Sequence, residues 1–121
     1  MPSRERVEAL VAMVEAGKFV EAIEQFYVEG ASMQENVGEK REGRDKLVAH
    51  EKGVLAHVKD MRARCARPVF VDGDRVAVNW IFEFTDPAGR ARTLNEIAWQ
   101  RWQGDRVVEE RFYYDPSQIR G

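Results

Sequence analysis

Residues 75–116 read RVAVNWIFEFTDPAGRARTLNEIAWQRWQGDRVVEERFYYDP and decide the fold of this chain. The stretch holds three runs in which apolar and polar residues alternate, separated by short turns at 86–89 and 104–105. Alternation of this period is typical of half-buried strands, and Gly, Pro and Asp suit the turns of hairpins. The stretch therefore predicts an antiparallel meander with strands over 75–85, 91–103 and 106–114.

The residues before this stretch predict one more long strand and a helical N-terminal half. Ser3 is a good N-cap for a helix that starts at Arg4, and Gly17 is a good C-terminal cap. Helical spacing of apolar residues then predicts a second and a third helix. The elements expected outside the meander are helices over 4–16, 19–30 and 44–59, a short strand over 31–37, a charged turn over 38–43 and a strand over 61–71. Helices followed by a meander indicate an α+β domain.

The strand over 75–85 has one face that is entirely apolar. Its alternate residues are Val76, Val78, Trp80, Phe82 and Phe84. We expect the helices to cover this face, because successive side chains of a strand point to opposite sides of the sheet. The opposite face is mixed and could join Ile97, Trp99 and Tyr113 in an exposed apolar patch, which often marks a subunit interface. A few scattered surface apolar residues are the other interpretation.

The next two strands do not reveal which face is buried, because both alternating sets mix apolar and polar residues. One arrangement places Glu96, Gln100, Glu110 and Tyr114 inside. Polar groups in an apolar interior need partners, water or a ligand. In the other arrangement the carboxylates face solvent or pair with arginines of the same strands.

Length, charge and cysteine content exclude several classes of protein. A chain of 121 residues predicts one domain spanning 1–121, and a net charge of −2 gives no reason to expect nucleic acid as a partner. Cys65 is the single cysteine, which fits a reducing cytoplasm. No apolar run approaches the ~18 residues that span a bilayer, and the N-terminus lacks the apolar centre of a signal peptide. We expect a cytoplasmic protein without a membrane partner.

Three segments carry a resemblance to a known family. They are FYVEGASMQENVG (26–38), EGRDKL (42–47) and WQRWQGDRVVEERFYYDP (99–116). Together they resemble the NTF2-like superfamily, most of all its SnoaL-like (polyketide cyclase-like) branch and ketosteroid isomerases. The resemblance implies a cone of three N-terminal helices packed on a curved antiparallel sheet that encloses a pocket. It also implies a homodimer formed through the outer face of the sheet.

The resemblance also implies which residues face the pocket. Glu35 falls where ketosteroid isomerases carry their proton-shuttling aspartate, Tyr27 matches a tyrosine beside the pocket, and His50 matches an inward aromatic residue of the third helix. These three residues are the catalytic candidates. The ligand-binding candidates are Met33, Val78, Trp80, Phe82, Glu96, Ala98, Gln100, Glu110, Phe112 and Tyr114.

Two positions depart from the isomerase pattern. The two groups that stabilise the enolate in those enzymes, a tyrosine and a protonated aspartic acid, fall here on Leu10 and Ala98. Neither side chain can donate a hydrogen bond, so steroid isomerisation by that route is not expected.

The first functional hypothesis is acid–base chemistry by Glu35 on a small, mainly apolar carbonyl or polyketide-like ligand, as in an isomerase, cyclase or lyase. Desolvation beside Trp80, Phe82 and Met33 would raise the pKa of Glu35 towards neutrality. The second hypothesis is a non-catalytic ligand-binding or dimeric scaffold domain. A third, epoxide hydrolysis by Glu96, Arg101 and Glu110, is disfavoured because alternation places Arg101 on the opposite face from Glu96.

No motif indicates a metal or a cofactor, and we expect neither. His50 and His57 are seven residues apart on one predicted helix, hence about 10 Å apart. One ion cannot bridge them directly, because zinc–nitrogen bonds are only ~2 Å long.

Overall fold

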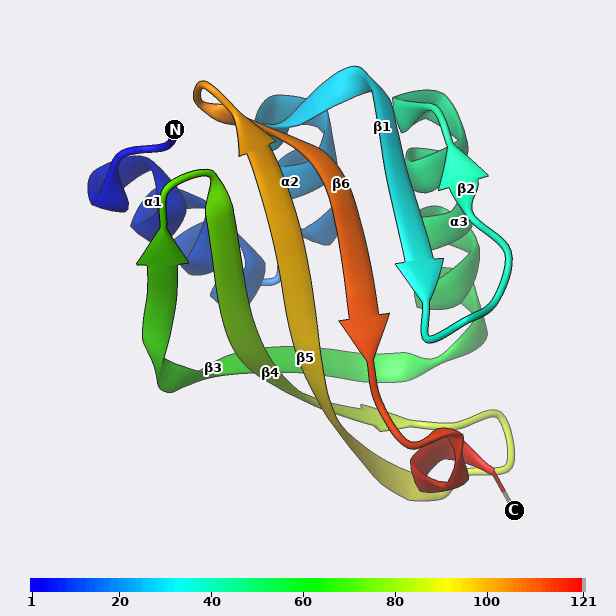
Figure 1. Cartoon of the computed structure of the whole chain (residues 1–121). Helices are drawn as coiled ribbons and strands as arrows, with labels where there is room; N and C mark the ends of the chain where they lie inside the picture. Colours follow the sequence, from blue (N-terminus) through cyan, green and yellow to red (C-terminus); the bar gives the residue numbers. More distant parts are fainter. Residues whose placement is uncertain (121) are drawn as a thin grey trace.

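The computed structural model describes residues 1–120 as three helices and one strongly curved six-stranded sheet (Figure 1). The fold is α+β, as the order of helices and strands predicted. The elements are α1 (Arg4–Glu15), α2 (Phe19–Phe26), β1 (Tyr27–Glu35), β2 (Arg41–Glu42), α3 (Arg44–His57), β3 (Lys59–Asp72), β4 (Arg75–Thr85), β5 (Ala91–Gln103), β6 (Arg106–Tyr113) and the 3₁₀-helix η1 (Pro116–Ile119).

The sheet is mixed, so the prediction of a wholly antiparallel sheet was wrong. Its strand order is β2-β1-β6-β5-β4-β3, and β1 runs parallel to β6 while every other neighbouring pair is antiparallel. A parallel pair needs a long crossover, and here residues 36–105 supply it. The predicted antiparallel meander of β4, β5 and β6 is confirmed with its two turns.

Two helix ends differ from the prediction. The second helix ends at Phe26 rather than near Gly30, because Tyr27 adopts extended backbone angles and pairs with Val107 of β6. The third helix ends at His57, two residues early, where Val58 becomes extended. Beyond both ends the chain enters a strand, since Tyr27 begins β1 and Lys59 pairs with Thr85 of β4.

The predicted inner face of β4 is confirmed. Val76, Val78 and Trp80 are buried against a core that includes Val7 and Leu10 of α1. Cys65 is also buried there as a small core residue. The basic residues of β3 lie at the exposed edge of the sheet, where charge discourages pairing with another strand. Within residues 1–120, no helix is long and apolar enough to cross a membrane.

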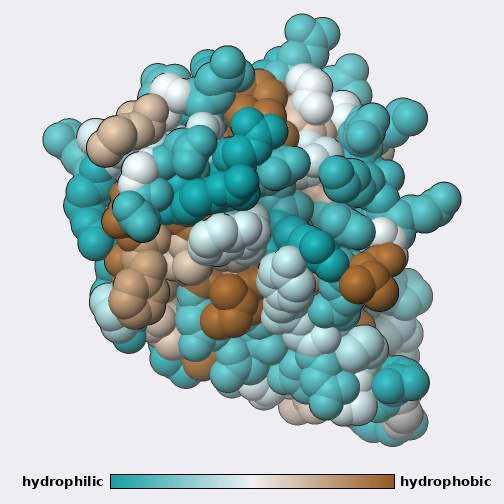
Figure 2. Space-filling view, in the orientation of Figure 1, coloured by the Kyte–Doolittle hydropathy of each residue, from teal (hydrophilic) through white to brown (hydrophobic). Residues whose placement is uncertain are grey.

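The outer face of the sheet exposes Ile97, Trp99 and Tyr113, each about two-fifths exposed. Figure 2 views the molecule from this side and shows hydrophobic side chains as separate spots among hydrophilic ones. Arginines fill part of the space between them, since Arg75 stacks on Trp99 and Arg111 on Tyr113. The apolar residues predicted for this face are therefore present, but they are interspersed with charge.

Candidate ligand-binding site

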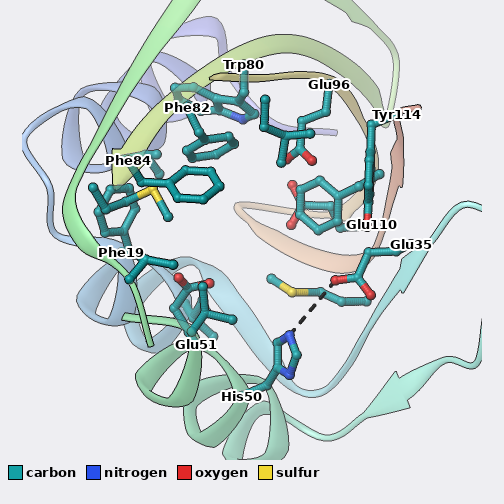
Figure 3. Close-up of a pocket in the computed structure, with 18 of the residues that line it drawn as sticks. Phe19, Glu35, His50, Glu51, Trp80, Phe82, Phe84, Glu96, Glu110 and Tyr114 are labelled. Atoms are coloured by element: carbon teal, nitrogen blue, oxygen red, sulfur yellow. Dashed lines mark ion pairs between the residues drawn. The ribbon is translucent and has the colours of Figure 1, made fainter. Parts of the chain in front are cut away.

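A cavity of about 400 Å³ lies between the helices and the inner face of the sheet. This volume is within the range of small-molecule sites. Figure 3 shows the labelled aromatic rings on one side of the cavity and the carboxyl groups of Glu35, Glu96 and Glu110 on the other, with Glu51 near Phe19. The aromatic side consists of Phe19, Trp80, Phe82 and Phe84, and the side rich in carboxyl groups of Glu35, Glu96, Glu110 and Tyr114.

The aromatic side is built by alternation along one strand and completed by a helix. Trp80, Phe82 and Phe84 are successive inward residues of β4, and Phe19 comes from the start of α2. The rings of Trp80 and Phe82 are tilted with centroids 6.0 Å apart, and those of Phe82 and Phe19 are 6.4 Å apart. These are favourable geometries for aromatic pairs, so the rings form a well-packed, apolar side of the cavity.

A buried chain of hydrogen bonds holds Glu110 in place. The indole nitrogen Nε1 of Trp102 donates to Gln100 Oε1 at 2.9 Å, so the amide nitrogen of Gln100 faces Glu110 and donates to its Oε2 at 2.7 Å. The hydroxyl of Tyr27 donates to the other carboxyl oxygen. Both oxygens of Glu110 are thus occupied, which makes this carboxyl a fixed part of the interior.

Burial dominates the titration of the two innermost carboxyl groups. It raises the pKa of Glu110 to about 7, although the hydrogen bonds from Gln100 and Tyr27 oppose the shift. It raises the pKa of Glu96 to about 8, and the neighbouring carboxyl groups of Glu110, Glu35 and Glu51 add to this. Near neutral pH the interior therefore resists the ionisation of both groups together.

Glu35 lies at the edge of the cavity rather than in its dry interior. Its side chain is 36% exposed and receives two hydrogen bonds from Arg41, at 2.7 and 3.1 Å. The nitrogen Nε2 of His50 lies 3.9 Å from a Glu35 oxygen, as marked in Figure 3. The desolvated environment predicted for Glu35 was wrong; the structure gives that environment to Glu96 and Glu110.

Three further titratable groups face the cavity. Burial lowers the pKa of His50, and Arg41 adds to this, so the imidazole is neutral near pH 7. Burial raises the pKa of Tyr114, with Glu35 and Glu96 contributing, so its hydroxyl stays protonated and can donate. Burial also raises the pKa of Glu51, which lies on α3 opposite the sheet.

Most of the residues predicted for the pocket do line it. The cavity wall includes Tyr27, Met33, Glu35, His50, Trp80, Phe82, Glu96, Gln100, Glu110, Phe112 and Tyr114. Val78 and Ala98 are the exceptions, because both are buried in the packed core and neither lines the cavity. Leu10, which takes the place of an oxyanion donor, lines it as an apolar residue.

Several cavity residues were missed from the sequence, among them Arg41 and Glu51. Arg41 was assigned to a charged turn, but the β1–β2 pairing sets it opposite Met33 and beside Glu35. Glu51 lies between Leu47 and Val54 on the inward side of α3, so the helical spacing of those apolar residues could have marked it as inward. Arg101 pairs with Glu109 at 3.2 Å on the outer face, so the trio with Glu96 and Glu110 is not assembled. No group of three metal-ligating side chains occurs in the described part of the chain.

Comparison with known proteins identifies the family to which this chain belongs. The SnoaL-like domain family matches residues 7–110. The chain belongs to this family. No curated protein matches it significantly in sequence. Its SnoaL-like fold is shared by many solved structures at low sequence identity.

Three of these structures show how closely the fold is kept. A Mesorhizobium loti protein described as a SnoaL-like polyketide cyclase has a TM-score of 0.80 at 21% identity, covering 94% of this chain and 100% of that one. An NTF2-like protein of unknown function from Burkholderia pseudomallei gives 0.82 at 17%, with 95% and 92% covered. A Catenulispora acidiphila protein with a ketosteroid isomerase-like fold, in complex with trimethylamine, gives 0.81 at 15%, with 97% and 90% covered.

Proposed function

We propose that this SnoaL-like protein binds a small, mainly apolar carbonyl compound in its cavity and moves a proton on it. The observation that carries the proposal is the division of one cavity into an aromatic side and a side rich in carboxyl groups. Aromatic rings would hold the carbon skeleton, and polar groups at fixed positions would act on its functional group. Isomerisation and aldol-type ring closure both begin with such a proton transfer.

Glu35 is the best placed general base. Its carboxyl group lines the cavity, and the two hydrogen bonds from Arg41 fix its position. A carboxylate of this kind would take a proton from the carbon next to the ligand carbonyl. The electron pair of the broken C–H bond would move to the carbonyl oxygen and give an enolate, which the return of the proton at another carbon would discharge.

Tyr114 is the best placed donor to that oxygen. Tyr27 donates its only hydroxyl proton to Glu110, and the Gln100 amide is held between Trp102 and Glu110. Tyr114 lines the cavity beside Glu96, and no other described residue is hydrogen-bonded to its hydroxyl. A phenol hydroxyl aimed at a developing oxyanion would replace the donors absent at Leu10 and Ala98.

Replacement of Glu35 by glutamine tests this role. We expect exchange of the carbon-bound proton of bound cyclic ketones, followed by NMR in D₂O, to slow by about 10²–10⁴-fold, because the amide cannot accept the proton. Glu42→Gln, at an exposed site on β2, should leave the exchange rate unchanged. An exchange rate equal to that of the unmodified protein would rule out Glu35 as the base.

Two other functions remain as specific alternatives. A non-catalytic binding domain would bind ketones and show no exchange above that of free solution. Epoxide hydrolysis is favoured by one observation, the contact of Arg41 with Glu35 in the cavity wall, since an arginine between carboxyl groups can orient a water molecule. Formation of diols from small apolar epoxides, lost in Glu35→Gln, would support it.

We also propose that the protein forms a homodimer through the outer face of the sheet. The exposed Ile97, Trp99 and Tyr113 on β5 and β6 support this. Ile97→Lys should convert a dimer into a monomer in analytical ultracentrifugation, because it places a charge in the middle of the contact. A monomeric unmodified protein at 100 µM would contradict the proposal.

A further inference from the structure

Glu96 is a buried acid without a partner. The residue is only 7% exposed, and its carboxyl group points into the cavity from β5 (Figure 3). No hydrogen bond or ion pair within residues 1–120 reaches its side-chain oxygens, although Glu110 beside it receives two donors. Buried carboxyl groups are normally paired, so the structure leaves this one available to a group that enters the cavity.

The partner that geometry offers to Glu96 is an aromatic ring. Trp80 lies directly opposite Glu96 in the antiparallel pairing of β4 and β5, and both side chains face inward. Side chains opposite each other in such a pair are about 5 Å apart at Cβ. Glu96 and Trp80 are therefore neighbours in the cavity wall, and carboxylates and aromatic rings are two of the groups that bind organic cations.

The acids around the cavity are also only partly paired with basic side chains. Two of its acids are neutralised, Glu35 by Arg41 and Asp86 by Arg92. For Glu51, Glu96 and Glu110, no arginine or lysine of the described residues forms an ion pair. A ligand that brings a positive charge would stabilise the ionised forms of these three carboxyl groups, whereas a neutral ligand would not.

We propose that the cavity takes a cationic ligand, a protonated or quaternary amine whose charged nitrogen lies between the Glu96 carboxylate and the ring of Trp80. This rests on the function proposed above and narrows its substrate to amine-bearing carbonyl compounds. The carbon skeleton packs on Phe82 and Phe84, and the carbonyl group reaches Tyr114 and Glu35. The nitrogen supplies the positive charge that the uncompensated carboxyl groups lack.

Two probes of the same shape and different charge test the proposal. Benzyltrimethylammonium carries a permanent charge, and neopentylbenzene is its neutral counterpart with carbon in place of nitrogen. We expect calorimetric titration at pH 8.5 to give an affinity for the cation at least tenfold higher, because the ionised Glu96 carboxylate offsets the cost of taking the positive charge out of water. Glu96→Gln should remove this preference, and Glu83→Gln, at an exposed site on β4, should keep it.

The pH dependence of cation binding provides a second readout. Glu110, Glu35 and Glu51 all raise the pKa of Glu96, and Tyr114, Arg41 and His50 face the same cavity. The permanent cation should bind the ionised carboxylate, so its affinity should increase at least tenfold from pH 6.5 to 8.5 as the proton leaves. In Glu96→Gln the affinity should change far less over this range. An affinity that is constant or decreases with pH in the unmodified protein would overturn the proposal.

The outcomes separate this inference from the proposed function. Equal or tighter binding of neopentylbenzene would overturn the cationic ligand while leaving a neutral ligand and the Glu35 chemistry intact. The preference for the cation could instead persist in Glu96→Gln and disappear in Glu35→Gln. The cation would then bind at the edge of the cavity, beside Glu35, and the proposed site at Glu96 would be wrong. If neither probe bound, both the cation site and the binding cavity would be contradicted. If Glu35→Gln lost proton exchange and kept the preference for the cation, both the proposed function and the cation site would be supported.

Discussion

Replacing Glu96 by glutamine is expected to stabilise the protein at pH 8 and to leave its stability almost unchanged at pH 4.5. In the folded protein the pKa of Glu96 is raised to about 8, from an ordinary value of 4.5. Below pH 4.5 the group is protonated in both the folded and the unfolded chain, so it has no effect. As pH rises from 4.5 to 8, the unfolded chain ionises first, and stability falls.

The size of the effect follows from the interval between the two pKa values. Each pH unit between the two pKa values lowers the free energy of unfolding by about 1.4 kcal/mol, so the total loss is on the order of 4 kcal/mol at pH 8. Glutamine has nearly the same shape and cannot ionise, which removes this cost. We therefore expect the free energy of unfolding of Glu96→Gln to exceed that of the unmodified protein by an amount that grows with pH.

Urea denaturation at pH 4.5, 6, 7 and 8 measures this difference. Glu83→Gln is the matched control, because the Glu83 side chain is on the same sheet but faces solvent. The difference in free energy of unfolding between Glu83→Gln and the unmodified protein should not change with pH. If the free energies of unfolding of Glu96→Gln and the unmodified protein differed by the same amount at every pH from 4.5 to 8, Glu96 would not be desolvated. The cation site argued above would then lose its central group.

Replacing Gln100 by methionine is expected to cost about 2–5 kcal/mol of stability. Gln100 is 2% exposed, and its amide accepts from Trp102 and donates to Glu110. Methionine has a similar length and no strong hydrogen-bonding group, so one donor and one acceptor are left buried without partners. Each such loss costs about 1–3 kcal/mol, and more where the group is charged.

Gln100→Met should lower the free energy of unfolding more at pH 8 than at pH 5. The hydrogen bond from Gln100 lowers the pKa of Glu110, so its removal disfavours the ionised form further. Gln103→Met, at an exposed position at the end of the same strand, should change stability by less than about 0.5 kcal/mol. A Gln100→Met protein as stable as this control would mean that the buried chain does not hold Glu110.

The parts of the fold that the sequence predicted well are those with local signals. The alternation of Val76, Trp80 and Phe82 decides the inner face of β4 without reference to any other strand. Glu96 and Glu110 lie on strands with two mixed faces, so their inward direction followed from family resemblance rather than from alternation. The structure then supplied what resemblance could not, the network that fixes Glu110 and the absence of one around Glu96.

The missed features depend on contacts between distant residues. Arg41 reaches Glu35 because a strand of only two residues pairs with β1, and so short a strand has no periodicity. Tyr27 follows an amphipathic helix and was counted with it, whereas pairing with β6 draws it into the sheet. The environment of Glu35 was wrong for the same reason, since its arginine partner could not be placed from the sequence.

The parallel pairing of β1 with β6 bears on how the protein acquires its cavity during synthesis. Met33 pairs with Glu110 and Glu35 with Phe112, although residues 36–105 lie between the two strands in the sequence. Contacts between such distant residues form slowly, because a long loop must close first. A nascent chain can therefore fold its first helices early, but Glu35 reaches its place beside the inner carboxyl groups only after β6 has left the ribosome.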